Sequence, residues 1–254
     1  MQGEVTTDRT ILEITGSDRM VFLQDLLTND IKVADNTLVY AALLSPQGKY
    51  LFDFFLFHRG ETTYLDVKSD MADALSSRLA MYRLRADVQI AKAEMTVTRG
   101  LDTGPEGGMP DPRNPALGWR RYDSDAPIGH VTENLINWDA IRVEHLIPEP
   151  GIELITGDSY ILEMGFERLN GVDFRKGCYV GQEVTARMKH KTELRKGLAR
   201  VTLDGPAKPG SDILRDGKTI GTLHTVAGPQ ALAYLRFDRA GDGMTADGAG
   251  VALG

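Results

Sequence analysis

Short apolar strands and helices with one apolar face alternate along the N-terminal part of the chain. The alternation of apolar and polar positions predicts strands at residues 10–14, 37–44, 50–57, 63–67, 87–91 and 95–99. Helical spacing predicts two helices with apolar faces, formed by Phe22, Leu23, Leu26 and Leu27 and by Met71, Leu75, Leu79 and Tyr82. We expect Ser17 or Asp18 to cap the first helix and Ser69 the second, because their side-chain oxygens can accept from free N–H groups. This order approximates a ferredoxin-like unit, in which two helices cover one face of an antiparallel sheet.

A run dense in glycine and proline, Leu101–Pro115, interrupts the pattern, and we expect an exposed loop there. Helical spacing returns at Asp139–His145 and ends at the prolines that follow it. We therefore expect an α+β region over residues 1–194, made of two ferredoxin-like units with a break near 101–115, and a second domain at 195–254.

That second domain consists of short β segments separated by glycine, proline and aspartate, which predict a small antiparallel β-barrel or sandwich. The segments are 198–203, 213–214, 219–225 and 231–237. Asp216 and Gly217 between two of them suit a two-residue hairpin turn. The glycine-rich stretch from Gly241 onward predicts a loose tail.

The composition is that of an ordinary globular protein, with 42% hydrophobic and 26% charged residues among 254. A formal net charge of −7 counts against direct nucleic-acid binding. Cys178 is the sole cysteine, so no intrachain disulfide can form and a reducing compartment fits. The apolar runs are shorter than the about 20 residues that cross a bilayer, and MQGEVTTDRT at the start lacks a signal core or an Arg-rich transit pattern. We expect a cytoplasmic protein that does not bind membranes.

Asp53 interrupts an apolar strand. Because alternate strand residues share a face, Asp53 is expected to lie with Leu51, Phe55 and Phe57. An ionised carboxylate on such a face costs several kcal/mol unless a partner compensates it. Two interpretations stay open: a buried aspartate satisfied by an arginine or by backbone N–H groups, and a carboxylate that faces a ligand pocket.

Arg142 and Glu144 lie two residues apart in the predicted short helix. Charges in such a segment usually mark a solvated face. A buried glutamate would instead suit a ligand, since a carboxylate can accept two parallel N–H donors from an amino-pyrimidine ring.

The segment 175–183, RKGCYVGQE, is the most unusual in the chain. Cys178 follows Lys176 by two residues, and cationic neighbours lower the pKa of a thiol. An inert core cysteine is the alternative. Five histidines leave a Cys–His hydrolase open, although none lies in a recognisable base motif. One thiolate cannot hold an iron–sulfur cluster, and no zinc-ligand spacing is present, so we expect no metal bound by this chain alone.

A basic run, Arg187–Lys196, stands out in an acidic chain. Such a run usually forms a solvated face, and it could also receive an anionic ligand tail or another macromolecule.

KGCYVGQE, Lys176–Glu183, resembles the signature of the YgfZ family, relatives of the glycine-cleavage T-protein, an aminomethyltransferase. Further segments match in order and extend the resemblance over most of the chain: Gly16–Ile31, Ser45–Phe57, Arg142–Gly151 and Gly217–Leu235. The resemblance implies ferredoxin-like units and a C-terminal barrel around a central hole that binds tetrahydrofolate. It also implies a part in the assembly or repair of iron–sulfur clusters in client enzymes, such as radical-SAM tRNA-modifying enzymes.

Carried over by position, the resemblance gives Glu144 the role of holding the pterin ring, with Arg142 beside it. Asp53 would line the folate site, and Cys178 would act as a thiolate whose charge Lys176 stabilises. Gln182 and Glu183 complete the signature as ligand-binding candidates.

Aminomethyltransferases carry an acidic pair near the position of Asp53, and Phe52 stands where the other acid would be. The sequence therefore favours a folate-binding accessory factor over an enzyme. A folate-dependent one-carbon transferase, with Asp53 assisting proton transfer, is one alternative. A tRNA-binding module that uses Arg187–Lys196 is the other.

Overall fold

The computed structural model describes residues 3–124, 136–190 and 194–254, and its contacts divide the chain into two compact units. Unit 1 consists of Met1–Leu135 and Glu167–Gln182, and unit 2 of Ile136–Phe166 and Glu183–Gly254. Segments distant in sequence thus belong to one unit. The expected boundary at residue 194 stays a prediction.

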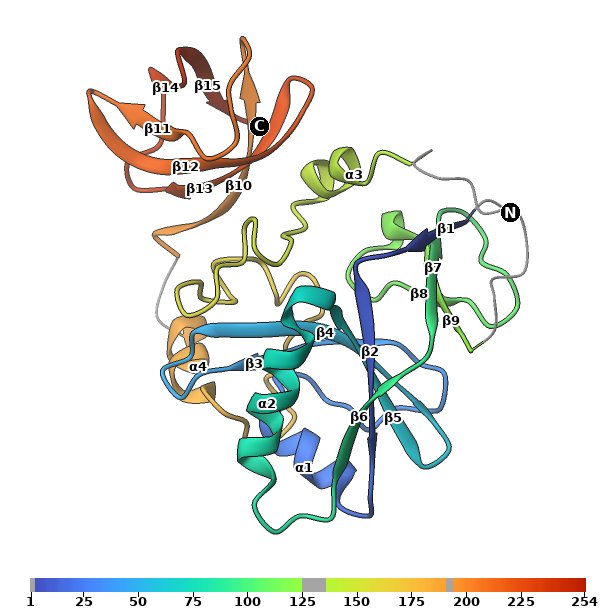
Figure 1. The fold of residues 1–254 in the computed structure, drawn as a ribbon. Helices are drawn as coiled ribbons and strands as arrows, with labels where there is room; N and C mark the ends of the chain where they lie inside the picture. The colour runs from blue at the N-terminus through green and yellow to red at the C-terminus, as the bar shows by residue number, and fades with distance from the viewer. Residues whose placement is uncertain (1–2, 125–135, 191–193) are drawn as a thin grey trace. The chain divides into compact units, whose positions relative to one another are not determined.

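Unit 1 contains a five-stranded antiparallel sheet with the order β3-β4-β5-β2-β6 (Figure 1). Its strands are β2 (Arg9–Thr15), β3 (Val39–Leu44), β4 (Tyr50–Arg59), β5 (Thr62–Lys68) and β6 (Gln89–Ala93). Its helices are α1 (Arg19–Leu26) and α2 (Ala72–Arg83), the latter preceded by the 3-10 turn η1 (Ser69–Met71). The order β4-β5-β2-β6 is that of a ferredoxin-like sheet, with β3 added at the edge, so this prediction is confirmed.

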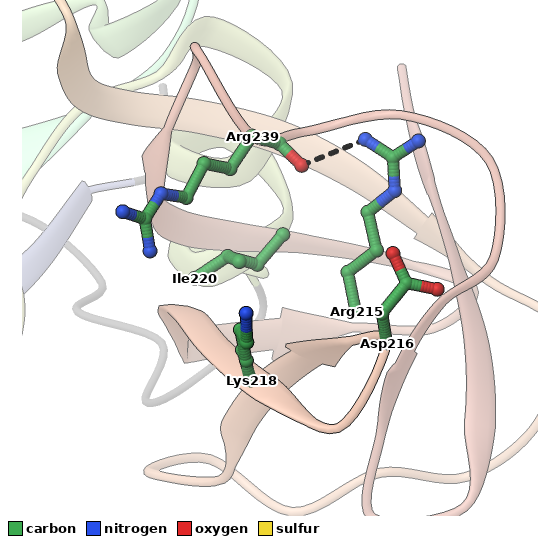
Figure 2. Close-up of a pocket in the computed structure, with 5 residues that line it drawn as sticks. All are labelled: Arg215, Asp216, Lys218, Ile220 and Arg239. Atoms are coloured by element: carbon green, nitrogen blue, oxygen red, sulfur yellow. Dashed lines mark hydrogen bonds between the residues drawn. The ribbon is translucent and has the colours of Figure 1, made fainter.

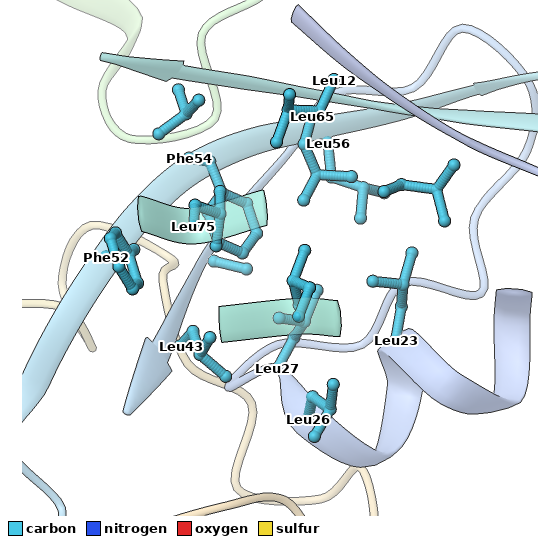
Figure 3. Close-up of a cluster of buried hydrophobic side chains, with 14 of the residues drawn as sticks. Leu12, Leu23, Leu26, Leu27, Leu43, Phe52, Phe54, Leu56, Leu65 and Leu75 are labelled. Atoms are coloured by element: carbon cyan, nitrogen blue, oxygen red, sulfur yellow. The ribbon is translucent and has the colours of Figure 1, made fainter. Parts of the chain in front are cut away.

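A hydrophobic core joins both helices to one face of this sheet (Figure 3). Leu23 and Leu27 from the first helix region and Leu75 from α2 are fully buried there. They contact alternate residues of β4, including Phe52 and Phe54, because side chains at every second strand position share a face. The expected helix faces and strand face therefore meet in one core.

The start of α1 differs from the expected side-chain cap. Asp18 occupies the N-cap position, but its side chain makes no capping hydrogen bond. Its carboxylate accepts instead from the backbone N–H of Asp87 at 2.8 Å, and the Ser17 hydroxyl lies 2.9 Å from the Asp87 carboxylate. The polar residues before the helix therefore fix the loop that leads into β6.

A β-bulge shifts the register between β3 and β4. Leu43 pairs with Phe52 but Leu44 pairs with Tyr50, so Leu51 is an extra residue. A bulge reverses the alternation of faces beyond it. Leu51 consequently packs against the helix-covered core, contrary to the face expected for it, and Tyr50 joins the face of Asp53.

A second sheet of unit 1 has the order β1-β7-β9-β8. Its strands are β1 (Gly3–Thr6), β7 (Thr96–Gly100), β8 (Met109–Pro110) and β9 (Trp119–Asp123), with the 3-10 turn η2 (Pro115–Leu117) before β9. The run expected as an exposed loop thus contributes a short strand and buries Met109 and Asp111. Asp111 stays buried because Arg113 and Arg120 both bind its carboxylate.

Unit 2 contains a closed antiparallel barrel with the order β10-β13-β12-β11-β14-β15 (Figure 1). Its strands are β10 (Lys196–Leu203), β11 (Asp212–Arg215), β12 (Lys218–Ala227), β13 (Gln230–Arg236), β14 (Met244–Ala246) and β15 (Ala249–Leu253). Asp216 and Gly217 have φ values of 52° and 72°, as the predicted hairpin turn requires.

The expected loose tail is wrong, because β14 and β15 form a hairpin that closes the barrel by pairing with β11 and β10. Asp247 and Gly248 form the turn, with φ values of 51° and 87°. These strands are short and rich in alanine and glycine, residues of low strand propensity, and so they gave no strand signal.

The remaining helices are α3 (Trp138–His145), in unit 2, and α4 (Gln182–His190). Asn137 caps α3 by accepting from the N–H of Ala140. No helix in the described part of the chain has the length and apolar content needed to cross a membrane.

Candidate functional site

The signature segment forms a loop before α4 that presents the sulfur of Cys178 to solvent. Cys178 is exposed and forms no disulfide. Gly177 before it is exposed as well, and its φ of 56° lies in the left-handed region. The flanking Lys176 and Tyr179 are 6% and 8% exposed. The alternative of an inert core cysteine is therefore excluded.

Lys176 anchors this loop to the end of α1. Its ammonium donates to the carbonyl oxygens of Gln24 and Leu27 and lies 5.4 Å from the ring centroid of Tyr179. Carbonyls at a helix C-terminus lack intrahelical donors, so a buried cation satisfies both their hydrogen bonds and the negative end of the helix dipole. Burial lowers the pKa of Lys176 to about 8, against the opposing effect of Asp30 and Asp25. At neutral pH the group that binds the carbonyls is thus still the ammonium.

These contacts give Lys176 a role that the sequence did not predict. The expected stabilisation of the Cys178 thiolate by Lys176 stays a prediction, since two of the three ammonium donors are directed to main-chain oxygens.

Further contacts fix the loop on its other side. The Gln182 side-chain oxygen accepts from the N–H of Tyr179 at 3.1 Å. Gly181 has a φ of 83°, and a Cβ there would lie 2.6 Å from the carbonyl oxygen of Ser45 and 3.0 Å from the Cα of Gly48. Only glycine fits so close to the β3–β4 turn. The β3–β4 hairpin and the segment Lys176–Glu183, which both resemble the YgfZ family in sequence, are thus in contact in the structure.

Upstream, the same segment is bound to the residues after α1. The Thr28 hydroxyl donates to the carbonyl of Gly171 at 2.7 Å, and the N–H of Asp173 donates to the carbonyl of Thr28 at 3.0 Å. The exposed thiol is therefore carried by a loop that is hydrogen-bonded on both sides.

In the part of the chain that the structure describes, metal ligands do not gather around this thiol. No group of three or more His, Cys, Asp or Glu side chains in the described residues could hold a metal ion. Within the same residues no hydrogen bond joins Cys178 to a histidine, and His58 is buried against Thr63 and the carbonyl of Ile31. The Cys–His hydrolase interpretation has no support in this geometry.

Asp53 is buried, at 6% exposure, and is satisfied by neither of the partners expected for it. The hydroxyls of Tyr40 and Tyr50 donate to its two oxygens at 2.8 and 2.6 Å. Burial raises the pKa of Asp53 above its ordinary 3.8, although both hydroxyls oppose this shift. Burial and the Asp53 charge raise the pKa values of both tyrosines, which therefore remain protonated donors.

A network of buried charges lies near Asp53, and the sequence analysis missed it. Arg9 and Arg120 both bind the Asp66 carboxylate, at 2.6 and 3.3 Å, and Tyr122 donates to it at 2.8 Å. The guanidinium of Arg120 stacks 4.0 Å from the ring centroid of Phe55. These charged residues are spread over β2, β5 and β9, so no spacing in the sequence could reveal the cluster.

Phe52, at the place of an aminomethyltransferase's second acid, points the other way. It is 6% exposed and lies in the core under the helices, on the face opposite Asp53. The structure thus places no second acid beside Asp53 at that position.

In unit 2, Arg142 belongs to a buried ion pair with Glu153. Its guanidinium lies 3.1 Å from Glu153 and 3.0 Å from Asp139, and it donates to the Thr225 hydroxyl at 2.7 Å. Burial lowers the pKa of Arg142, but Glu153 and Glu149 outweigh this and raise it. Glu153 also accepts from the N–H and the hydroxyl of Thr225, so this network ties α3 to β12.

Glu144, expected to hold the pterin ring, is exposed. Among the described residues its carboxylate has no hydrogen bond or ion pair, whereas its backbone carbonyl accepts from Arg200 at 3.3 Å. The buried carboxylate of this region is Glu153, which the sequence analysis missed. Glu144 is thus free to accept N–H donors from a ligand, while Arg142 is occupied by the fold.

The structure brings Lys176 and Cys178 together on one loop of unit 1, followed by Gln182 at the start of α4. Unit 1 also contains Asp53. Arg142 and Glu144 belong to unit 2, and Glu183 is exposed in the first turn of α4. Part of the basic run forms the last turn of α4, with Arg187 and Lys189 exposed, and residues 191–193 lie outside the described residues.

The fold has a clear counterpart among solved structures. Glycine cleavage system aminomethyltransferase T from Bartonella henselae superposes with a TM-score of 0.74 over 99% of this chain and 84% of that one, at 14% sequence identity. This likeness establishes the aminomethyltransferase-like fold. Residues 195–253 match the family described as the C-terminal β-barrel domain of CAF17.

Sequence relatives narrow the class to iron–sulfur cluster assembly factors built on this fold. The mitochondrial assembly factors named IBA57 of Homo sapiens and Mus musculus are 31% and 30% identical, over 89% and 91% of this chain and 75% and 76% of their own lengths. The homologue of Mycosarcoma maydis is 30% identical over 80% of this chain, which spans 58% of that relative. The chain belongs to the IBA57 family of iron–sulfur cluster assembly factors.

Two expectations are corrected by these relatives. All three are named as mitochondrial proteins, so the expectation of a cytoplasmic protein is wrong. They are IBA57 proteins rather than YgfZ proteins, so the resemblance is confirmed for the wider family of aminomethyltransferase-like assembly factors and not for the YgfZ branch.

Proposed function

We propose that this chain assists the assembly or repair of iron–sulfur clusters, with Cys178 as the group that contacts iron, sulfide or a partner thiol. The observation that carries the proposal is the exposed sulfur of Cys178 on a loop anchored by Lys176 and Gln182. A loop held in place presents the sulfur in one position, so little ordering is required when a partner binds.

A single cysteine can act as a temporary ligand while a cluster is transferred, but it cannot hold a cluster by itself. A resident cluster normally takes four ligands, most of them cysteines, and Cys178 is the sole cysteine of the chain. The cluster would therefore stay on a partner, an assembly factor or a client enzyme, while Cys178 serves as a transient ligand. Radical-SAM tRNA-modifying enzymes are the clients that we propose.

Tetrahydrofolate is the cofactor that we propose. The exposed and unpaired Glu144 carboxylate supports this proposal, because it can accept two parallel N–H donors from a pterin. Asp53 adds no support, since it is buried and both of its oxygens already accept from tyrosines. The absence of an acid at Phe52 favours a binding factor over an aminomethyl transferase.

Protection of the thiol tests the role of Cys178. The rate of its alkylation would be measured in the free chain, with a cluster-loaded assembly scaffold, and with the same scaffold without its cluster. We expect fast labelling alone, slow labelling with the loaded scaffold, and little protection by the apo scaffold. Equal labelling under the three conditions would exclude contact between this thiol and the cluster.

Calorimetric titration tests the cofactor separately. Tetrahydrofolate would be titrated into the wild type, Glu144→Ala and Glu61→Ala, where Glu61 is an exposed glutamate between β4 and β5, outside every candidate site, used as a matched control. We expect binding to be lost in the first variant and kept in the second. Wild-type protein that gives no binding heat, or equal affinity in Glu144→Ala, would overturn the folate assignment without touching Cys178.

A further inference from the structure

The barrel contains a pocket of about 290 Å³ that no part of the proposed function uses (Figure 2). It is lined by Arg215, Asp216, Lys218, Ile220 and Arg239. The first three come from the β11–β12 hairpin, Ile220 lies further along β12, and Arg239 follows β13. All five belong to unit 2, so the pocket is formed within the barrel alone.

Arg215 is held in place before any ligand arrives. One terminal nitrogen of its guanidinium donates to the backbone carbonyl of Arg239 at 2.9 Å. The backbone of Gly241 lies against the same guanidinium, since a Cβ there would come within 3.0 Å of that nitrogen. The guanidinium keeps further N–H donors, because an arginine has five. Its position therefore depends on the main chain and not on an acidic partner.

The pocket concentrates positive charge in an acidic protein. Three cations and one carboxylate line it, while the chain has a formal net charge of −7. Among the described residues none of Arg215, Lys218 and Arg239 forms a salt bridge, in contrast to Arg236 nearby, which pairs with Asp238 at 3.1 Å. Asp216 is the acid that lines the pocket. Asp238 is not among the lining residues; its hydrogen bond with Arg236, and the charges of Arg236 and Arg239, lower its pKa. The lining residues themselves thus carry an excess of positive charge, which suits an anionic ligand.

The floor of the pocket is apolar. Ile220 is 3% exposed because it packs into the barrel core, and the small part of its surface that remains lines the pocket, between Lys218 and Arg239 in Figure 2. A guanidinium fork with a second guanidinium and an ammonium suits a dianionic phosphate, for which arginine supplies paired donors and lysine a point charge. The isoleucine suits a carbon group attached to that phosphate.

We propose that this pocket binds a phosphate monoester, with Arg215, Lys218 and Arg239 around the phosphate and Ile220 under the organic group. This site is separate from Cys178 and Glu144, and it does not depend on the function proposed for them. Its ligand gives the barrel a binding role of its own.

The test is a titration of the full chain followed by amide NMR, with phenyl phosphate, inorganic phosphate and glutarate as probes. We expect phenyl phosphate to bind saturably, with shifts confined to residues 215–220 and 239–241, and to bind more tightly than inorganic phosphate. Glutarate, a dicarboxylate without the phosphate geometry, is expected to bind more weakly than either.

Substitutions assign the site. Lys218→Gln and Arg239→Gln are each expected to weaken phenyl phosphate binding about fivefold to tenfold, as loss of one partly exposed charge contact implies. Gly241→Ala, which displaces Arg215, is expected to weaken it as well. Lys208→Gln removes an exposed barrel lysine outside the pocket and is expected to change nothing.

Each of the other outcomes overturns part of the proposal. The absence of saturable shifts at millimolar phenyl phosphate, or equal weakening by Lys208→Gln, would refute the site. Glutarate binding as tight as that of phenyl phosphate would refute the phosphate class, and equal affinity for inorganic phosphate would refute the contact with Ile220. Urea unfolding of each variant verifies that its barrel is intact.

Discussion

The adjacent cations Arg175 and Lys176 give a sharp test of how the thiol loop is held. The Arg175 side chain is 94% exposed, whereas Lys176 as a residue is 6% exposed and its ammonium binds the carbonyls of Gln24 and Leu27. Lys176→Met keeps the length of the side chain and removes its donors. Arg175→Met makes the same kind of change at the neighbouring, exposed position.

The expected cost follows from the two carbonyls. A buried acceptor left without its donor costs about 1–3 kcal/mol, so losing both donors costs about 2–6 kcal/mol before relief of the buried charge. Burial lowers the pKa of Lys176 to about 8, which shows that burying its ammonium is itself unfavourable. We therefore expect Lys176→Met to lose about 2–3 kcal/mol of unfolding free energy, in the lower part of that range. Arg175→Met should change it by less than about 0.5 kcal/mol.

Urea denaturation at pH 7 measures both variants, and alkylation of Cys178 measures the thiol in the same samples. Anchoring predicts a lower unfolding free energy for Lys176→Met alone. Equal stability of the two variants, with slower alkylation only in Lys176→Met, would refute the anchoring role and favour direct stabilisation of the thiolate.

Three further predictions concern other parts of the chain. The pKa of Asp53 is raised in the folded state, so the carboxyl of the unfolded chain ionises first as the pH rises. The unfolding free energy of the wild type should therefore fall between pH 3.8 and the raised pKa. Asp53→Asn should lack this loss when urea unfolding is followed from pH 3.5 to 7. Gly181→Ala should destabilise the chain by at least about 1 kcal/mol, from its positive φ alone, and a thermal melt unchanged from wild type would contradict the close approach to the facing turn. Glu153→Gln should cost about 3 kcal/mol, because it removes the fully buried partner of Arg142 while Asp139 and Glu149 remain beside the guanidinium. Asp139→Asn, at the exposed partner of the same arginine, should cost about 0–1 kcal/mol in urea denaturation.

The sequence was informative wherever periodicity and core packing coincide. The helix faces with Leu23 and Leu75 and the strand face with Phe54 were all predicted correctly, because burial of one face repeats along each element. The hairpin turn at Asp216 was predicted for a local reason as well, since a left-handed pair has its own residue preference.

Features that depend on a single irregularity were missed. The bulge at Leu51 brings Tyr50 onto the face of Asp53, and strict alternation places it on the other face. The turn at Asp247 was not predicted, because the strands on either side of it, β14 and β15, have a low strand propensity. Its Asp-Gly pair is the same as the pair in the turn at Asp216, which was predicted.

Roles that depend on distant contacts could not be inferred at all. Nothing near Lys176 in the sequence shows that its partners are carbonyls of Gln24 and Leu27, about 150 positions earlier. Likewise the buried partner of Arg142 is Glu153 rather than the adjacent Glu144, a choice made by packing against β12. The exposure of Cys178 could not be predicted either, because the motif left a reactive thiol and an inert core cysteine open, and only the structure shows the exposed thiol.

The central claim is that the exposed sulfur of Cys178 takes part in cluster assembly, and client maturation tests it most directly. The rate at which an apo client acquires its [4Fe–4S] cluster from a loaded scaffold would be followed by absorbance and electron paramagnetic resonance, with wild-type chain, with Cys178→Ser and with no chain added. We expect Cys178→Ser to give the rate without the chain while its urea midpoint equals that of the wild type. A folded Cys178→Ser variant that supports the full wild-type rate would contradict the account.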